Sequence, residues 1–342
     1  MDGSRACTGT LRNPREPPVT TFPRASAESN GRQPAPALQK KVIVGLDIGG
    51  SKTHGVRIDG GRVTRNEVAG SANVQNVDQA TAASNVRHLM SALGGMDADE
   101  VYVGAGGIDT QEDAANLRKL ISPHAPRANV EIVHDTRLIL AAAGQDAGIA
   151  VIAGTGSAVW GTNEAGDEAR SGGWGFLLGD EGSGYWFGRE AVRHSLRQFN
   201  LGLAPDELTR LLLSDCGLDH PEQLISHFHT NHDRRYWAQR SSVVFEAAAH
   251  GHVLSHAIIR EGGWHLADQV LQVAQRLALV GPVVLGGGLG VHQPALVEAL
   301  NAHLAGEGLP AAKPLAVEPV FGAVHLAGAY LAAGTGPAAG GP

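Results

Sequence analysis

Two segments with the same strand–turn–strand pattern stand roughly 100 residues apart in this chain, and they constrain its fold more than any other feature. The first, KVIVGLDIGGSKTHGVRID, begins at Lys41, and the second, IAVIAGTGSAVWGT, begins at Ile149. In each, apolar residues lead into a turn rich in Gly, Ser and Thr and then into a second strand-like run, which indicates an antiparallel pair. A repeat this long is not that of a solenoid, so the sequence predicts two related halves.

The elements expected around these segments give the two halves similar orders. After the first strands, the pattern predicts a helix over Val77–Leu93, a strand over Val101–Gly107, a helix over Glu112–Ile121, and a strand over Val130–Asp135 leading into the helix TRLILAAAG. The first half is therefore β-β-β-α-β-α-β-α. The second half begins in the same way, is mainly helical from Gly182 to Ala278, and ends with a strand in PVVLGGGLG, Pro282–Gly290, that enters a glycine turn and a helix.

Composition excludes several classes of partner. The net charge of −7 and pI near 6.1 disfavour nucleic acid or an anionic membrane surface as a partner. Glycine and hydroxyl residues interrupt the longest uncharged stretches, which disfavours a membrane-spanning segment. Two cysteines, Cys7 and Cys216, cannot build a disulfide framework, so we expect a reducing, cytoplasmic setting. Residues 1–40 lack the apolar segment of a signal peptide and, like 334–342, are expected to be disordered tails. A small-molecule substrate fits these features best.

The two glycine-rich turns, DIGGSKT and GTGS, are candidate phosphate sites. A turn of this kind points successive backbone N–H groups into one concavity, where they can bind an anion without charged side chains. Other phosphate motifs are missing, since the sequence has no Gly-Lys-Ser/Thr of a P-loop, and Gly104–Asp109 lacks the third glycine of a dinucleotide fold. Either turn alone could be only a turn, but two in equivalent places of a repeat favour function.

Three carboxylates stand next to predicted turns. Asp135 ends a strand and begins a helix, where an open α/β sheet places ligand-binding residues, although a plain helix N-cap is an equal reading. Asp47 ends an apolar strand beside the first turn, where a carboxylate is favoured by a cation such as hydrated Mg²⁺. Asp180, between glycines with Glu181, can accept hydrogen bonds from hydroxyls or be a solvated turn.

Several histidines are spaced closely enough to suggest a metal site, but the residues around them do not support one. His227, His229 and His232 are close together, and a second group contains His250, His252 and His256. No carboxylate or cysteine stands at metal-ligand spacing beside them, and HFHTNHDRR reads as a polar surface segment. We therefore expect structural or surface roles.

Taken together, these motifs resemble the sugar-kinase, actin and heat-shock-chaperone superfamily, and within it the N-acetylglucosamine kinase and BadF/BadG/BcrA/BcrD ATPase family. The resemblance runs from about Val42 to Ala333. GLDIGGSKT is similar to the family's first phosphate loop, IAGTGS to its second, HDTRLILAAAG to its catalytic-aspartate helix, and VLGGGLG to its adenosine loop. The most specific match is GGWGFLLGDEGSGYW, whose glycines and aromatics line the sugar pocket in the family.

The resemblance implies a two-lobed actin-like ATPase (ribonuclease H-like) α/β fold with duplicated βββαβαβα halves and an active-site cleft between them. The N-terminal lobe would cover residues 41–145, with a helix at about 322–333 packing back on it. The larger C-terminal lobe would cover 146–321 and contain a helical insert at about 190–260.

The resemblance also assigns roles to residues of this sequence. Asp135 would be the base that takes the proton of the sugar hydroxyl, and Asp47 would organise Mg²⁺ beside ATP. The β- and γ-phosphates would lie in a cradle of Gly49, Gly50, Ser51, Lys52, Thr53, Gly154, Thr155, Gly156 and Ser157. The adenosine would meet Gly287, Gly288, Leu289 and Gly290, and the sugar would meet Asn73, Ala105, Gly106, Asp135, Gly172, Gly173 and Asp180.

The activity implied is ATP-dependent phosphorylation of the 6-hydroxyl of an amino sugar, N-acetylglucosamine first, with glucosamine or another hexosamine or muramic-type sugar as alternatives. Ala105 and Ser171 stand where some N-acetylglucosamine kinases carry Ser and Cys, a difference that bears on the sugar. Activators of radical dehydratases and kinases with a Cys-rich zinc loop are disfavoured by the two cysteines. A non-catalytic sugar or nucleotide sensor remains the reading from another class. A homodimer is expected by symmetry.

Overall fold

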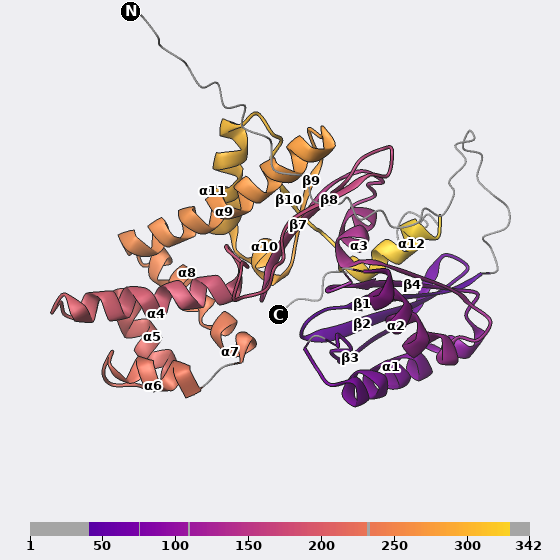
Figure 1. Ribbon diagram of the computed structural model, residues 1–342, viewed down its shortest axis with the longest axis horizontal. Helices are drawn as coiled ribbons and strands as arrows, with labels where there is room; N and C mark the ends of the chain where they lie inside the picture. Colours follow the sequence, from indigo (N-terminus) through magenta and orange to yellow (C-terminus); the bar gives the residue numbers. More distant parts are fainter. Residues whose placement is uncertain (1–40, 75, 109, 231–232, 329–342) are drawn as a thin grey trace, which may run out of the picture.

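The computed structural model describes residues 41–74, 76–108, 110–230 and 233–328, and within them the chain forms two five-stranded sheets. Figure 1 shows the sheets side by side, with α3 and α12 between them and a group of helices extending from the second sheet. Both expected tails, the end of the expected C-terminal helix beyond residue 328, and His232 lie outside the described residues.

The first sheet has the strand order β3-β2-β1-β4-β5. Its β1 pairs antiparallel with β2 and parallel with β4, which in turn pairs parallel with β5. Two helices and two short 3₁₀ turns lie between these strands, and a third helix follows the last of them. The elements are β1 (Val42–Ile48), β2 (Lys52–Asp59), β3 (Arg62–Gly70), α1 (Gln79–Leu93), η2 (Gly95–Asp97), β4 (Glu100–Ala105), α2 (Gln111–Ile121), η3 (Ser122–His124), β5 (Asn129–His134) and α3 (Asp135–Ala142).

The second sheet has the order β10-β9-β6-β7-β8, which repeats the first when the strands are matched in chain order. Here too the first strand pairs antiparallel with the second and parallel with the fourth. Its strands are β6 (Gly148–Ala153), β7 (Ser157–Thr162), β8 (Glu168–Gly172), β9 (Val283–Gly286) and β10 (Lys313–Pro314). The duplicated βββαβαβα order predicted from the repeat is therefore confirmed.

Helices fill the long connection between β8 and β9 and follow β9. They are α4 (Gly184–Asn200), α5 (Glu207–Cys216), α6 (Gln223–Thr230), α7 (Arg234–Gln239), α8 (Ser241–Ala249), α9 (Val253–Leu277), α10 (Gly288–His292), α11 (Pro294–Gly306), η4 (Pro319–Phe321) and α12 (Gly322–Leu326). Within the described residues, no helix combines the length and the apolar composition needed to cross a membrane.

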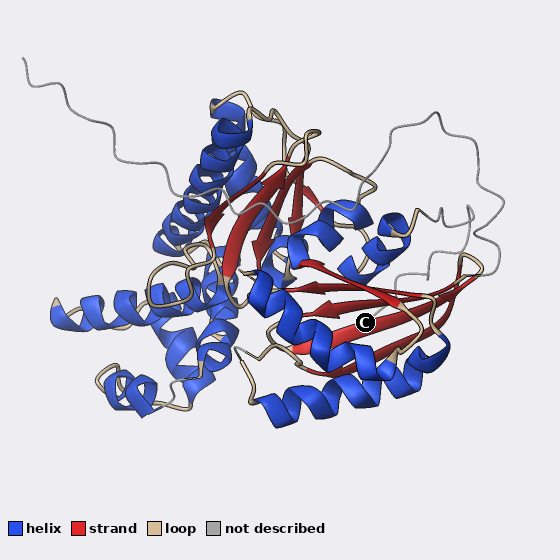
Figure 2. Ribbon diagram, turned by 45° about the vertical axis from the view of Figure 1, so that its right-hand side comes forward, coloured by secondary structure: helices blue, strands red, loops and turns tan. Residues whose placement is uncertain are grey.

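Successive side chains of β1 point to opposite faces of the first sheet, and helices cover both of these faces. Val44, Leu46 and Ile48 join a cluster with the buried face of α1, whereas Ile43 on the opposite face packs with residues of η4 and α12. Figure 2 shows the first sheet with helices on its two sides. A sheet buried on both faces favours the nearly continuous apolar strand IVGLDI rather than an alternating one.

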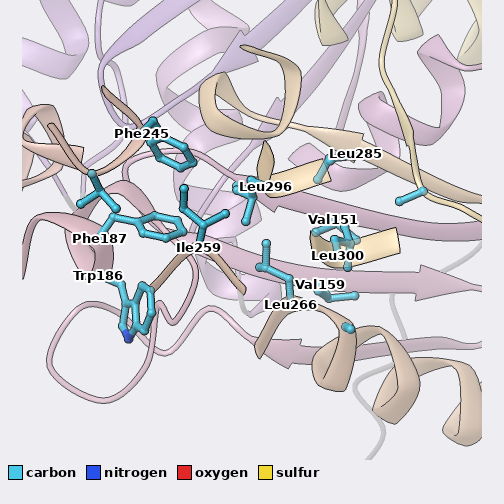
Figure 3. Packing of buried hydrophobic residues seen from close by; sticks show 14 of the residues in the cluster. Val151, Val159, Trp186, Phe187, Phe245, Ile259, Leu266, Leu285, Leu296 and Leu300 are labelled. Atoms are coloured by element: carbon cyan, nitrogen blue, oxygen red, sulfur yellow. The ribbon is translucent and has the colours of Figure 1, made fainter. Parts of the chain in front are cut away.

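The second half has a larger core, in which aromatic residues of α4 meet the long helix α9. Trp186 and Phe187 are buried, and the Phe187 ring meets that of Phe245 on α8 with centroids 5.0 Å apart (Figure 3). Gly262 on α9 allows this packing, because a Cβ there would lie 2.5 Å from the Phe187 ring. Part of the aromatic and glycine content of GGWGFLLGDEGSGYW thus serves the core rather than a pocket.

The start of α3 corrects one expectation. Asp135 does not cap this helix: His134 occupies the N-cap position and Asp135 is the first helical residue. The plain N-cap reading of Asp135 is therefore wrong, since capping requires the residue before the first helical one.

Candidate active site

The turn between β1 and β2, Gly49–Thr53, is fixed by the loop that follows β3. Thr53 is fully buried, and its Oγ1 accepts a hydrogen bond from the Ala72 backbone N–H at 2.9 Å. The hydroxyl of Ser71 donates to the Gly49 carbonyl at 2.8 Å. Side-chain hydroxyls on both sides of the turn thus satisfy backbone groups and hold the turn in one shape. A fixed turn is what a preorganised anion site requires.

Asn73, Gly106 and Asp135 lie together at the carboxyl ends of β4 and β5. Asn73 Nδ2 donates to the Gly106 carbonyl at 3.0 Å. A Cβ on Gly106 would lie 3.0 Å from Asp135 Oδ2, so glycine leaves this carboxylate oxygen room for a ligand. Ala105, the last residue of β4, is buried at 2% exposure, so its methyl group packs in the core and makes no polar contact.

The carboxylate of Asp135 is the polar centre of this group. Its Oδ1 is buried and has no hydrogen bond within the described residues, although His134 Nδ1 lies 2.9 Å away without hydrogen-bond geometry. The His134 ring stacks on Trp160 of β7, with centroids 4.1 Å apart, so the residue before Asp135 is held by the other half of the molecule. A buried carboxylate oxygen without a partner is costly unless a ligand satisfies it.

Asp47 lies near the end of β1, on the face of the sheet toward Asp135 and Glu318. Burial, with repulsion from Asp135 and then Glu318, raises the pKa of Asp47 to about 7, while Lys52 opposes the rise. A cation placed between these carboxylates would remove the repulsion. The three carboxylates do not converge to metal-ligand distance among the described residues, so a Mg²⁺ held by Asp47 would need further ligands from water and from the nucleotide.

The second turn, Gly154–Ser157, is held by the segment that leads into α4. Gly184 donates its backbone N–H to the Gly154 carbonyl at 2.8 Å, and Tyr185 donates to the Thr155 carbonyl at 3.2 Å. The Ser157 hydroxyl donates to the Glu181 carbonyl at 2.7 Å. The stretch GDEGSGYW is thus the support of this turn, a function that its sequence pattern does not reveal.

Asp180 lies beside the second turn and is almost completely buried. Its Oδ1 accepts from the Ser157 backbone N–H at 3.4 Å, and its Oδ2 is buried without a hydrogen bond among the described residues. The residue has a left-handed backbone, φ 63°, which is uncommon for a residue other than glycine. Burial raises the pKa of Asp180, and the nearby guanidinium of Arg234 counteracts part of that rise.

Gly172 and Gly173, at the end of β8, both have φ 70°, a conformation that favours glycine. A Cβ on Gly172 would also lie 2.3 Å from Gln269 Oε1, an oxygen that is itself buried without a hydrogen bond among the described residues. Further along, Trp174 is 58% exposed and stacks on Arg170 at 4.3 Å, unlike the buried aromatics of α4. The glycines here are required by backbone geometry.

The turn after β9 meets the second turn. A Cβ on Gly154 would lie 3.9 Å from the Gly287 Cα, whereas Gly290 packs against Leu285. Gly287 has φ 83°, and Gly288 has nothing within 4 Å of a Cβ position. Gly287 and Gly288 therefore border the second glycine turn, while Gly290 is part of the packing of α10.

The predicted residues form two groups. One lies in the first half around Asp47, Asn73 and Asp135, and the other in the second half around Gly154–Ser157 and Asp180. Two further residues belong beside them. His134 lies within the motif HDTRLILAAAG, which assigns it no role. Arg234 belongs to HFHTNHDRR, which the sequence predicts to be a polar surface segment, but its Nη2 lies 2.8 Å from a Cβ position on Gly156. No periodic pattern marks an arginine on a six-residue helix.

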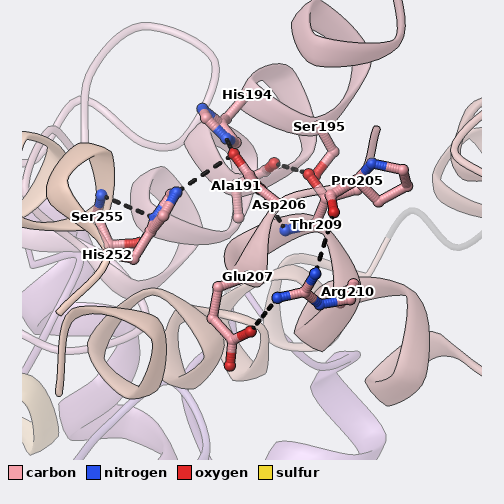
Figure 4. Close-up of polar contacts among 10 residues, drawn as sticks. All are labelled: Ala191, His194, Ser195, Pro205, Asp206, Glu207, Thr209, Arg210, His252 and Ser255. Carbon is pink, nitrogen blue, oxygen red and sulfur yellow. Dashed lines mark hydrogen bonds and ion pairs between the residues drawn. The ribbon is translucent and has the colours of Figure 1, made fainter. Parts of the chain in front are cut away.

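A separate histidine cluster ties together α4, α5 and α9 (Figure 4). His194 Nε2 and His252 Nε2 lie 2.6 and 3.2 Å from the same oxygen, Asp206 Oδ2, and the three groups are near enough to hold a metal ion. His252 Nδ1, however, accepts from the Ser255 backbone N–H as the cap of α9, so its proton lies on Nε2, facing Asp206. A metal on Nε2 would force that proton onto Nδ1, against the cap. The cluster is better explained as hydrogen bonding between helices.

We expect Asp206→Asn to destabilise the protein by about 1 kcal/mol near neutral pH, because asparagine can still cap α5 but loses the charged oxygen that faces His194 and His252. Burial alone would raise the pKa of Asp206, but hydrogen bonds from Thr209 and His194 hold that pKa below its ordinary value. The stabilisation is therefore complete above the ordinary pKa of the carboxyl and is lost as pH falls through the lowered value. Urea unfolding at pH 7 and in acid measures this.

The matched control for this change is Asp219→Asn, at an exposed position between α5 and α6. The control should unfold like the wild type at both pH values. A constant difference between Asp206→Asn and wild type across this pH range would contradict the assigned ionisation.

The two sheets with the same strand order define a protein of the actin-like ATPase fold class. The chain belongs to the BadF/BadG/BcrA/BcrD ATPase family, whose model matches residues 44–327. It is 29% identical over 315 residues to the N-acetyl-D-glucosamine kinase of Dictyostelium discoideum, an alignment that covers 85% of this chain and 98% of the relative.

Two further similarities agree with this family. The chain is 30% identical over 249 residues to the N-acetylmuramic acid/N-acetylglucosamine kinase of Clostridium acetobutylicum, covering 70% of this chain and 81% of the relative. Its fold is that of a ROK family glucokinase from Streptomyces griseus, solved with glucose and AMPPNP, with a TM-score of 0.55 at 15% identity and coverage of 83% and 98% of the two chains.

Proposed function

We propose that this protein transfers the γ-phosphoryl group of ATP to the 6-hydroxyl of an amino sugar, with N-acetylglucosamine as the preferred substrate. Both curated relatives are sugar kinases, phosphotransferases with an alcohol group as acceptor, and both carry N-acetylglucosamine in their names. The observation that carries the proposal is a pair of aspartates, each with a buried oxygen that lacks a hydrogen bond within the described residues: Oδ1 of Asp135 and Oδ2 of Asp180. Each carboxylate also lies beside a glycine, Asp135 Oδ2 next to Gly106 and Asp180 Oδ2 next to Gly156. Sugar hydroxyls are donors that such oxygens can accept.

Asp135 is placed to act as the base. Phosphoryl transfer requires the acceptor hydroxyl in line with the phosphate and one carboxylate to take its proton. The room left by Gly106 in front of Asp135 Oδ2 supports this role, because a side chain there would occupy the place of the hydroxyl. Asn73, which is bonded to the Gly106 carbonyl, would help to orient the sugar.

The nucleotide would lie against the glycine turns. Backbone N–H groups of Gly49–Thr53 and Gly154–Ser157 would receive the phosphates, and Gly287–Gly290 would border the adenosine. Asp47 would hold Mg²⁺, which supplies neutralisation of phosphate charge when bound with ATP. Closure of the proposed lobes, residues 41–145 with the helix at about 322–333 and residues 146–321, would exclude water from the transfer.

A coupled ADP-release assay tests the proposal. Mg-ATP is supplied with N-acetylglucosamine, glucosamine, N-acetylmannosamine, N-acetylmuramic acid, glucose or no sugar. We expect the highest kcat/KM with N-acetylglucosamine, and ³¹P NMR of the product should show a 6-phosphate. A preference for N-acetylmuramic acid or glucosamine would correct the substrate. Release that is independent of every sugar, or none at all, would contradict the proposed kinase and favour an ATPase or a binding protein.

Assembly is a separate proposal. We expect a homodimer, the commonest closed assembly, and sedimentation velocity of the purified chain distinguishes it from a monomer.

A further inference from the structure

The guanidinium of Arg234, the first residue of α7, lies against the second glycine turn. A Cβ built on Gly156 would be 2.8 Å from Arg234 Nη2 and 2.8 Å from Asp180 Oδ2, so both side chains occupy the space beside this glycine. Arg234 Nη1 is 3.8 Å from Asp180 Oδ2, which is within ion-pair range but too long for a hydrogen bond. The arginine side chain is about one-third exposed, at 32%, so a ligand can reach it.

Close packing between α4 and α7 brings the arginine to this place. A Cβ on Gly188 would lie 2.1 Å from the Trp237 carbonyl oxygen, and one on Gly184 would lie 3.1 Å from the Ala238 Cβ. The rings of Tyr185 and Trp237 meet with centroids 5.6 Å apart. Two glycines of GSGYWFG thus allow α7 to approach the element that also supports the second turn through Gly184. The position of Arg234 relative to Gly154–Ser157 is therefore set by rigid packing, not by a free loop.

The Arg234 guanidinium forms an ion pair with Asp180 but no hydrogen bond to it. At 3.8 Å, Asp180 Oδ2 gains attraction from the charge but remains without a hydrogen bond among the described residues. The backbone N–H groups of a glycine turn and a guanidinium are both donors to phosphate oxygens, and arginine binds them in a bidentate fork. Together they form a site for an anion with more than one oxygen.

We propose that Arg234 binds the terminal phosphate of ATP and stabilises it during transfer. This inference rests on the proposed function and deepens it, because it adds a side-chain cation to the second glycine turn, whose proposed donors are backbone N–H groups. Removing an arginine that contacts the transferred phosphoryl group lowers turnover strongly, because charge on the equatorial oxygens is neutralised less well in the transition state. ADP, which lacks the terminal phosphate, should be bound almost independently of Arg234.

The test compares Arg234→Gln with Arg235→Gln, a matched control at the exposed neighbouring position on the same helix. Calorimetry measures binding of Mg-AMPPNP and Mg-ADP to each full-length variant, and the coupled assay measures kcat and KM. For Arg234→Gln we expect AMPPNP affinity to fall by about 10-fold to 50-fold and kcat by about 100-fold or more, with ADP affinity within about threefold of wild type. Arg235→Gln should match wild type in all of these.

Several outcomes would overturn the assignment. Equal loss of AMPPNP and ADP affinity, accompanied by a lower melting temperature, would indicate a structural role. A loss confined to the KM of N-acetylmuramic acid would indicate that Arg234 binds a carboxylate of the sugar, and an unchanged AMPPNP affinity would remove it from the site. The binding comparison does not need turnover. If wild type phosphorylates no sugar but the AMPPNP contrast persists, the proposed function fails while the phosphate contact stands.

Discussion

Asp135→Asn is expected to lower kcat by about 100-fold to 10,000-fold, the contribution of a positioned general base. Asparagine keeps the size of the side chain but cannot take the proton of the acceptor hydroxyl. N-acetylglucosamine and Mg-AMPPNP should still bind within a few-fold of wild type, because the fixed neighbours of Asp135, Gly106 and Asn73, are unchanged. Steady-state kinetics and calorimetry on the same preparation separate the two effects.

Asp97→Asn is the control for this change, since Asp97 is exposed in the same half of the molecule. It should leave kcat and both affinities as in wild type. Undiminished turnover in Asp135→Asn would exclude Asp135 as the base. A loss of sugar affinity with normal kcat would instead assign it to binding, and equal loss in both variants would point to a general effect on folding.

The order of the elements could largely be predicted from the sequence because its signals are local and repeated, but the expectation that PVVLGGGLG holds the final strand is wrong, since the two-residue strand β10 follows it. Each half begins with two apolar strands around a glycine turn. When the strands are numbered within each half, the order 3-2-1-4-5 recurs in both sheets. The turns, and the aspartates at strand ends, follow from the same pattern, because an open sheet places residues at the carboxyl ends of its parallel strands side by side. Asn73, Gly106 and Asp135 meet for this reason.

Other features depend on packing between distant segments and leave no local signal. Trp174 and Trp186 stand in one glycine-rich stretch, yet the first is largely exposed and the second is in the core beside α9. The stacking of His134 on Trp160 joins the two halves across 26 residues of chain, and nothing in either strand indicates it. Arg234 reads as surface because its helix is short and polar, and only the close approach of α4 and α7 turns it toward Gly156.

Gly287→Ala is expected to have the second largest effect, on stability and nucleotide binding together. A Cβ at this position would lie 2.5 Å from the backbone oxygen of Ala153, and the residue has φ 83°. Left-handed strain and overpacking each cost about 1–3 kcal/mol, so we expect a loss of roughly 2–5 kcal/mol in the free energy of unfolding. Ala153 directly precedes the second glycine turn, so the displaced backbone should also lower AMPPNP affinity.

Gly288→Ala is a stringent control, because it is the next residue and the same substitution. A Cβ on Gly288 has nothing within 4 Å, and its backbone is not left-handed. Its free energy of unfolding should stay within about 1 kcal/mol of wild type, as for an alanine that fits its backbone. Urea unfolding measures both variants, and calorimetry with Mg-AMPPNP and N-acetylglucosamine measures binding. If both variants unfold at the same urea concentration, the turn relaxes without cost. If Gly287→Ala is destabilised but binds AMPPNP normally, strain at Ala153 does not reach Gly154–Ser157, and the turn after β9 supports the fold rather than the nucleotide.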